Sequence, residues 1–121
     1  MHAALGVTLA LVFQMAHIVE HTEFPVPDQS TNVIENEWAE HQVATTANFA
    51  MKNKVISWFV GGLNYQIEHH LYPRISHIHY PNISKIVQET CEELEIKYHA
   101  FPTFWQAFVS HMKFLKRLGT A

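Results

Sequence analysis

Blocks of apolar residues at helical spacing, separated by short polar stretches, predict a helical chain. The first block, Met1–Val19, is predominantly apolar, and Ala3–Ala16 carries no charged side chain. Nineteen residues at a rise of ~1.5 Å each just span a bilayer core of ~30 Å, so we expect a transmembrane helix within residues 1–22. A secretory signal peptide is the alternative, but it needs a basic start and a small-residue cleavage site, and neither is present.

Polar residues then interrupt the apolar pattern. Pro25 and Pro27 predict the end of the first helix, and Pro25–Asn32 predicts a polar loop. A second helix is predicted over Glu35–Asn53. One face of it carries an unusual stripe at near-helical spacing, made of Trp38, His41, Thr45, Asn48 and Phe49. Such a stripe indicates contact with a site or an interface.

The apolar segment Val55–Leu63 is too short to cross a membrane. We interpret it as an interfacial or re-entrant segment, or as a core helix. Gly61 and Gly62 at its end permit close approach of another part of the chain.

Two amphipathic helices are predicted in the last third of the chain. Asn82 can cap the first, whose apolar stripe comprises Ile83, Ile86, Val87, Thr90, Cys91 and Leu94. Pro102 and Thr103 open the second, and Gly119 is its expected C-terminal cap. The residues expected to face inward on this last helix are Phe104, Phe108, Met112 and Leu115.

The predicted fold class is therefore all-α, with a transmembrane helix in residues 1–22 and a cytoplasmic helical part in residues 35–121. The cytoplasmic side follows from charge: all eight Lys and Arg residues lie at Lys52 or later. Lys and Arg near membrane helices favour the cytoplasmic side. With 121 residues, the chain has room for about one domain.

Net charge and the numbers of cysteine and histidine residues exclude some classes of function and favour others. The formal net charge is −3, which disfavours nucleic acid as a partner. Cys91 is alone, so no intramolecular disulfide is possible, and we expect a buried thiol. Ten histidines are several times what this length usually holds, and they point to metal chemistry.

The strongest candidate for that chemistry is Gln66-x-x-His69-His70. On a helix, residues at i, i+3 and i+4 project from one face, and imidazole nitrogen and amide oxygen are both metal donors. A structural zinc site usually needs four clustered Cys or His ligands, and Cys91 is remote from this run, so iron is favoured. Gln66 is either a weak ligand or a hydrogen-bonding partner that orients one.

Other polar residues are candidates for the same site. His17 lies in the first apolar block, where an ionisable group is costly and by default functional. His21, one turn later, is a second ligand or, more simply, a polar interfacial residue. His41, Asn48 and Glu68 are expected to orient ligands without binding metal, with solvent as the alternative for Glu68. The histidines without ligand roles are His77 and His79, in a polar loop, and His2, His99 and His111.

The run WFVGGLNYQIEHHLYP resembles the last histidine box of membrane fatty acid desaturases, especially front-end desaturases, in which glutamine replaces the first histidine of H-x-x-H-H. Three further stretches are similar: FQMAHIVEHTEFP, WAEHQVATTANFA and FPTFWQAFVSHMKFL. The resemblance covers nearly the whole chain but only the C-terminal part of such an enzyme. The two earlier histidine boxes and the H-P-G-G haem motif are not in this sequence.

This resemblance implies an oxygen-dependent enzyme with two irons that inserts a cis double bond into a fatty acyl chain. The substrate would be a fatty acyl-CoA or acyl-lipid, and the electrons would come from cytochrome b5 or ferredoxin. It places His17 among the iron ligands, at the cytoplasmic end of the last transmembrane helix. The enzyme would be an integral membrane protein with its histidine box on the cytoplasmic side.

Two alternatives stay open from the sequence. The same iron architecture serves lipid hydroxylases and ketolases, and a truncated, non-catalytic membrane protein is also compatible. Because the earlier boxes are missing, we expect the 121-residue chain alone to be inactive.

Overall fold

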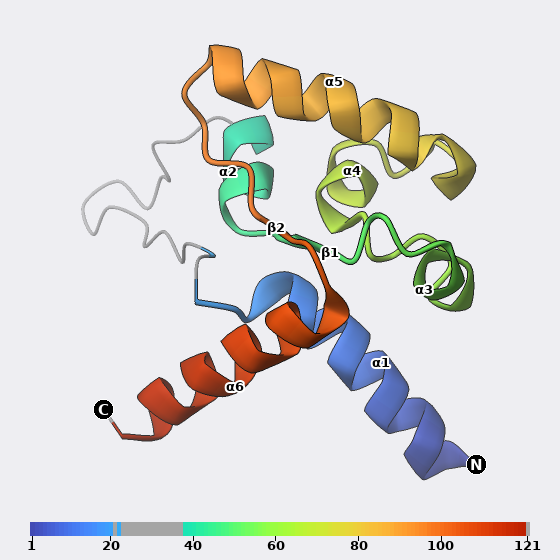
Figure 1. Cartoon of the computed structure of the whole chain (residues 1–121), viewed down its shortest axis with the longest axis vertical. Coiled ribbons are helices and arrows are strands. Elements are labelled where there is room, and N and C mark those ends of the chain that lie inside the picture. The colour runs from blue at the N-terminus through green and yellow to red at the C-terminus, as the bar shows by residue number, and fades with distance from the viewer. Residues whose placement is uncertain (21, 23–37, 121) are drawn as a thin grey trace.

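The computed structural model describes residues 1–20, 22 and 38–120, and these are mostly helical, as the all-α prediction requires. A short parallel strand pair joins the helices (Figure 1). The elements in chain order are α1 His2–His17, α2 Trp38–Ala44, β1 Asn48–Phe49, α3 Lys54–Phe59, α4 Gln66–Leu71, the 3-10 turn η1 His77–His79, α5 Tyr80–Glu93, β2 Ala100–Phe101 and α6 Phe104–Gly119.

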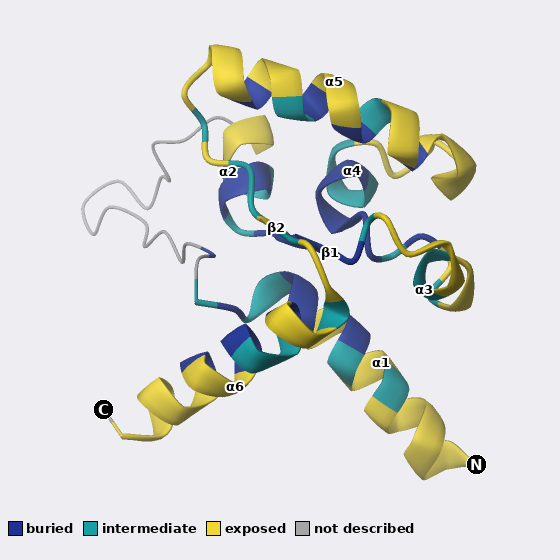
Figure 2. Ribbon diagram, in the orientation of Figure 1, coloured by how far each residue is buried: buried dark blue, intermediate teal, exposed yellow. Residues whose placement is uncertain are grey.

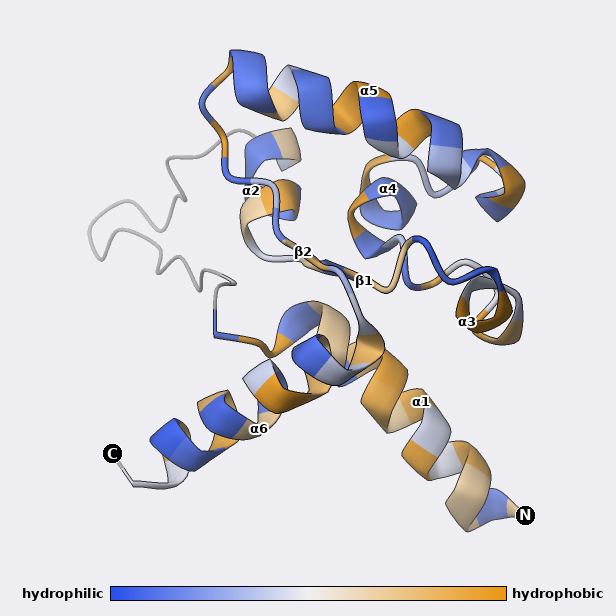
Figure 3. Cartoon of the chain, viewed as in Figure 1, coloured by the Kyte–Doolittle hydropathy of each residue, from blue (hydrophilic) through white to orange (hydrophobic). Residues whose placement is uncertain are grey.

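Helix α1 is shorter than the transmembrane helix expected within residues 1–22. It has 16 residues and ends at His17. Among the described residues, no helix combines the length and the apolar character needed to cross a membrane. The helix is nevertheless strongly apolar along its length (Figure 3). Its last turns bury Val12, Met15 and Ala16, whereas its first half leaves apolar side chains exposed.

The prediction of one helix over Glu35–Asn53 is wrong at its C-terminal end, because α2 ends at Ala44. The residues that follow form backbone hydrogen bonds with distant segments instead of with their own helix. The Ala47 N–H donates to the Ala16 carbonyl (2.8 Å), and the Asn48 N–H donates to the His99 carbonyl (2.9 Å). Long-range pairing therefore overrides local helix propensity here. The predicted loop Pro25–Asn32 lies outside the described residues.

Strand β1 is the junction of the fold. It pairs in parallel with β2, with Asn48 opposite Ala100 and Phe49 opposite Phe101. In Figure 1 the pair lies between α2, α4 and α5 on one side and the crossing helices α1 and α6 on the other. Two buried clusters flank it (Figure 2). One contains Val12, Met15, Phe49, Ala50 and Ala107, and the other contains Val43, Ile67, Val87 and Cys91.

The helix predicted to start at Asn82 begins slightly earlier, at Tyr80, with Pro81 in its first turn, where the missing N–H costs nothing. Val87 and Cys91 face the core, so the prediction of a buried thiol is confirmed. Ile86 and Leu94 were expected on the same stripe but are exposed.

Helix α6 opens as predicted, with the Thr103 hydroxyl oxygen accepting a hydrogen bond from the Gln106 N–H (3.2 Å). Its predicted inward face is wrong in part, because Met112 and Leu115 are exposed. The helix packs on α1, and its buried side chains, two of them polar, are Ala107, Ser110, His111 and Phe114. The His111 Nδ1 contacts the Ile18 carbonyl oxygen (2.7 Å), and the Ser110 hydroxyl accepts from the Glu20 N–H (3.1 Å). These bonds fix the end of α1, and they explain why a polar face is buried.

Helix α3 occupies the N-terminal part of the segment Val55–Leu63. The side chain of Asn53 caps it by accepting from the N–H groups of Val55 and Ile56 (both 3.1 Å). None of the residues of α3 is fully buried, but Ile56, Val60 and Leu63 of this segment pack against the first buried cluster.

The core at the strand junction gives a direct stability test. Phe49 is 0% exposed, whereas Phe59 is 67% exposed. We expect Phe49→Ala to lower the free energy of unfolding by about 3–5 kcal/mol, because it removes a large buried side chain and leaves a cavity. The matched change Phe59→Ala is expected to stay within about 0.5 kcal/mol. Urea unfolding followed by circular dichroism measures both, and equal losses would contradict the assignment of the core.

Candidate metal centre

The predicted histidine box forms helix α4, and the chain enters it through a tight turn. Gly61 and Gly62 both have positive φ, and a Cβ placed on Gly62 would lie 2.5 Å from the Cβ of His77. The predicted close approach is therefore confirmed at Gly62. On α4, Gln66, Ile67 and Glu68 are buried, and His69 and His70 are half-buried.

The structure brings three of the predicted ligands together. His17, the last residue of α1, lies beside His70 with 5.0 Å between ring centroids. The rings of His69 and His70 are 6.0 Å apart. The end of α1 thus meets the histidine box, although His17 and His70 lie 53 positions apart in the sequence.

Each of these imidazoles has one hydrogen bond to the surrounding protein. His70 Nδ1 contacts the Gln42 amide oxygen (2.8 Å), so it carries the proton of a neutral ring and leaves Nε2 with a lone pair. His69 Nδ1 contacts the Tyr80 hydroxyl (3.2 Å), and His17 bonds to the backbone of Thr45. Metal-binding histidines usually have such a partner on the second nitrogen.

Sequence reasoning missed Gln42 and Tyr80. A weak signal existed for Gln42, which is adjacent to His41 on the predicted polar helix. Tyr80 had no such signal, because its role depends on the return of the chain at η1.

Burial shapes the charge state of the histidines. The pKa of His17 is lowered by burial, and its hydrogen bond to Thr45 acts in the opposite direction. The pKa of His70 is lowered first by burial and then by the neighbouring His17 and His69. Both rings therefore favour the neutral form, which is the form that binds metal.

Glu68 forms a buried polar network on the opposite side of α4. Its carboxylate accepts from the Tyr98 hydroxyl (2.7 Å) and from the Asn48 amide (2.7 Å), and it is fully buried. The Asn48 oxygen accepts in turn from the Ile67 N–H (2.9 Å). The solvent alternative for Glu68 is therefore wrong, and the pairing alternative describes its contacts. Tyr98 was missed, because nothing in the sequence links it to a residue 30 positions earlier.

Burial raises the pKa of Glu68, and the hydrogen bonds from Tyr98 and Asn48 act in the opposite direction. The pKa of Tyr98 is also raised, first by burial and then by the nearby Glu68 charge. In this pair the Tyr98 hydroxyl keeps its proton and donates the hydrogen bond, and the Glu68 carboxylate accepts it.

Among the described residues, the buried amide oxygen of Gln66 has no hydrogen-bond partner. The side chain is 1% exposed, so its Oε1 atom is shielded from solvent. A buried orphan acceptor costs free energy unless something pairs with it, and a metal ion or a metal-bound water would do so. The donor set, three imidazoles and one amide oxygen, suits iron.

The three imidazoles do not form a closed ligand set by themselves. Within the described ranges, no group of three or more His, Cys, Asp or Glu side chains is close enough to hold a metal ion. The chemistry of these donors fits iron, but the described residues do not form a metal site by themselves. His41 lies on α2, which contacts α4, and its buried Nδ1 has no hydrogen-bond partner within the described ranges. His21 lies outside the described residues.

The remaining histidines are placed away from this group. His2, His77 and His79 are exposed, and the side chain of His77 also lies close to Gly62. The predicted polar loop of His77 and His79 is the 3-10 turn η1. His111 contacts the Ile18 carbonyl oxygen, so its ring serves the packing of α6 on α1.

Comparison with known proteins identifies the family. The sequence profile described as fatty acid desaturase matches residues 1–102. The chain is 44% identical to an sn-1 linoleoyl-lipid 6-desaturase of Synechocystis sp., over 96% of this chain and 32% of that protein. It is 46% identical to an acyl-lipid (8-3)-desaturase of Physcomitrium patens, over 94% of this chain and 23% of that protein.

A third relative, an acyl-lipid (8-3)-desaturase of Mortierella alpina, is 44% identical over 92% of this chain and 25% of its own length. The chain thus spans about a third or less of these relatives. No solved structure matches it. The resemblance in the histidine box and the match over residues 1–102 agree: the chain belongs to the fatty acid desaturase family.

Proposed function

We propose that the whole protein is an oxygen-dependent diiron desaturase that inserts a cis double bond into a fatty acyl chain. The observation that carries this proposal is the meeting of His17 with His69 and His70, each ring held by a separate hydrogen bond. Family membership supplies the reaction class, and the oriented, neutral imidazoles supply the donors.

In this proposal His17, His69 and His70 bind iron, and Gln66 is a weaker or indirect ligand. When bound, two irons supply the power to activate O₂ and remove hydrogen from unactivated methylenes, which acid–base groups cannot do. A diiron centre with mainly histidine ligands needs roughly twice these donors. The others would come from the earlier histidine boxes of the whole enzyme.

The side chains around the ligands have positioning roles in the same proposal. Gln42 and Tyr80 would hold the rings of His70 and His69, and Glu68 would hold α4 through Asn48 and Tyr98. His41 would help to orient the ligands without binding metal. His21 remains a candidate of the same kind.

The names of the relatives favour an acyl-lipid substrate over a fatty acyl-CoA. The glutamine at Gln66 favours desaturation between an existing double bond and the carboxyl end, as its resemblance to front-end enzymes implies. Cytochrome b5 or ferredoxin is the proposed electron donor.

We also propose that the protein is integral to a membrane, with α1 in contact with lipid and the histidines on the cytoplasmic side. The exposed apolar side chains of α1, among them Leu5, Leu9 and Phe13, support lipid contact. The placement of all Lys and Arg residues at Lys52 or later supports the sidedness.

The iron-ligand assignment can be tested in a protein that includes the earlier histidine boxes. We expect His69→Ala or His70→Ala to lower product yield at least about 100-fold, because a lost ligand weakens the whole centre. The matched change His79→Ala, at an exposed histidine of the same region, is expected to leave the yield near that of the wild type. Gas chromatography of acyl products and membrane abundance are the measurements. Near-normal yield from either ligand variant would disprove the assignment.

The neutral histidines predict a pH dependence of stability in the metal-free chain. Because the pKa values of His17 and His70 are lowered on folding from the ordinary 6.5, the unfolded chain binds more protons below that pH. Their contribution is complete above about pH 6.5 and is lost as the pH falls through their folded pKa values. Glu68, whose pKa is raised, contributes with the opposite sign, since the folded chain holds its proton more readily.

The histidine contribution is isolated by comparison with a His17→Asn/His70→Asn variant. We expect the free energy of urea unfolding to fall more steeply in the wild type than in this variant between about pH 7.5 and about pH 5.5. Parallel curves would show that the two rings do not titrate differently in the folded and unfolded chains.

A further inference from the structure

Helix α6 has an apolar face that no described part of the chain covers. It packs on α1, and its buried side chains are Ala107, Ser110, His111 and Phe114. About a third of a turn around the helix lie Trp105, Met112 and Leu115, which are 67%, 48% and 40% exposed. Trp105 stacks on the partly buried Phe108, with 5.4 Å between ring centroids. We call the exposed side chains Trp105, Met112 and Leu115 the outer stripe.

Positive charge borders the outer stripe. Lys113, Lys116 and Arg117 are exposed on the third face of α6. No Asp or Glu occurs after Glu95, so this end of the chain is purely basic. Arg117 also lies over the Phe114 ring at 5.0 Å from its centroid, which holds one cation near the helix surface.

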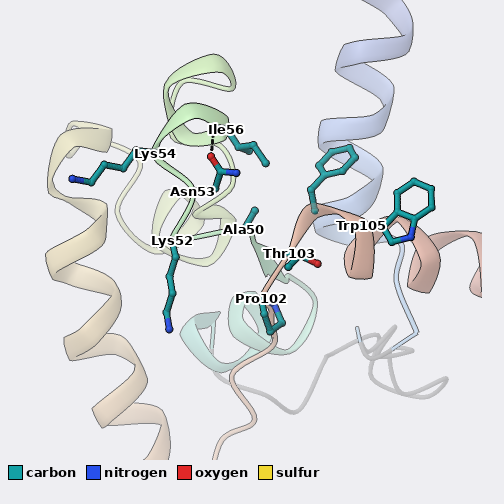
Figure 4. A pocket seen from close by; sticks show the side chains of 9 residues that line it. Ala50, Lys52, Asn53, Lys54, Ile56, Pro102, Thr103 and Trp105 are labelled. Carbon is teal, nitrogen blue, oxygen red and sulfur yellow. Dashed lines mark hydrogen bonds between the residues drawn. The ribbon is translucent and has the colours of Figure 1, made fainter.

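A cavity of about 700 Å³ next to the start of α6 also combines an aromatic side chain with basic side chains. Its lining includes Trp105 together with Lys52 and Lys54 (Figure 4). The surface therefore joins an aromatic side chain at one end of the stripe with cations from a second segment.

These features suit one kind of partner. A helix of 16 residues is ~24 Å long, too short to cross a bilayer core of ~30 Å, so an exposed apolar stripe on it can meet lipid only by lying along the surface. Tryptophan at the headgroup level and Lys or Arg beside an apolar face are typical of interfacial helices. The three basic side chains complement a negatively charged lipid surface, and the one carboxylate that lines a pocket together with Lys113 is that of Glu20.

We infer that α6 docks its outer stripe on the surface of an anionic lipid bilayer, with Lys113, Lys116 and Arg117 directed at the lipid phosphates. The apolar side chains of the stripe enter the boundary between headgroups and acyl chains. This docking deepens the proposed membrane location and needs no iron. Its failure is therefore separate from failure of the iron proposal, since it is measured on the metal-free chain and the ligand variants are not involved.

The test uses the full 121-residue chain with Trp38→Phe and Trp58→Phe, so that Trp105 is the remaining tryptophan. Vesicles contain phosphatidylcholine with phosphatidylglycerol, and a second set carries dibrominated acyl chains. Because α1 can also bind lipid, flotation alone does not report on α6. We expect the brominated lipid to quench Trp105. Unquenched Trp105 in chains that float with vesicles would overturn the inference.

Variants then test the apolar side chains and the basic side chains of this surface separately. Met112→Glu/Leu115→Glu is expected to remove most of the quenching of Trp105 by brominated lipid, because two apolar side chains no longer enter the interface. The matched control Ile86→Glu/Leu94→Glu makes the same change at two exposed apolar positions of the α5 region and is expected to be quenched like the parent. Lys113→Gln/Lys116→Gln/Arg117→Gln is expected to lose most of the preference for phosphatidylglycerol over phosphatidylcholine alone.

Two results would contradict the inference even if the chain binds lipid. One is equal quenching of Trp105 by brominated lipid in the stripe variant and in its α5 control. The other is a vesicle-free dimer, seen by sedimentation, that the Met112→Glu/Leu115→Glu change dissolves, since a second copy would then cover the stripe. Circular dichroism of each variant verifies that the helices are intact.

Discussion

A buried carboxylate, Glu68, is the constraint on which the arrangement of this chain depends. An ionised carboxylate without partners in a protein interior is very costly, so its burial requires hydrogen-bond donors in fixed positions. Tyr98, just before β2, and Asn48, in β1, supply them. The Asn48 side-chain oxygen also accepts from the Ile67 N–H. The Asn48 side chain therefore binds α4 at one side chain, that of Glu68, and at one backbone group, that of Ile67. Glu68 therefore links the histidine box to the strand pair.

The same strand segment holds the other half of the site. The Ala47 N–H bonds to the Ala16 carbonyl, one residue before His17, while the next residue, Asn48, binds α4. Two adjacent residues thus set the distance between His17 and the box. Helix α6 adds a second hold on the end of α1 through His111 and Ser110. The family profile ends at residue 102, so α6, which makes these two hydrogen bonds, lies outside the matched residues.

The sequence predicted the elements whose signals are local. The cap at Thr103, the buried Cys91, the turn at Gly62 and the grouping of Gln66, His69 and His70 on one helix all follow from nearby residues. It failed where contacts between distant segments decide the structure. The helix after Trp38 stops because Ala47 and Asn48 pair elsewhere, and α6 buries Ser110 and His111 because they bond to the end of α1. The partners of the site, Gln42, Tyr80 and Tyr98, were missed for the same reason. A hydrogen bond between residues 28, 11 or 30 positions apart leaves no periodic trace in one sequence.

The central claim is that Asn48 and its neighbours bring His17 and His70 together before any metal binds. Nuclear Overhauser effects between the ring protons of these two histidines, in the metal-free chain, test it most directly. At a centroid separation of 5.0 Å the cross-peaks are expected in the wild type. They are expected to vanish in Asn48→Ala, with the helical circular dichroism retained. Absence of the cross-peaks in the wild type, or their persistence in Asn48→Ala, would contradict the account.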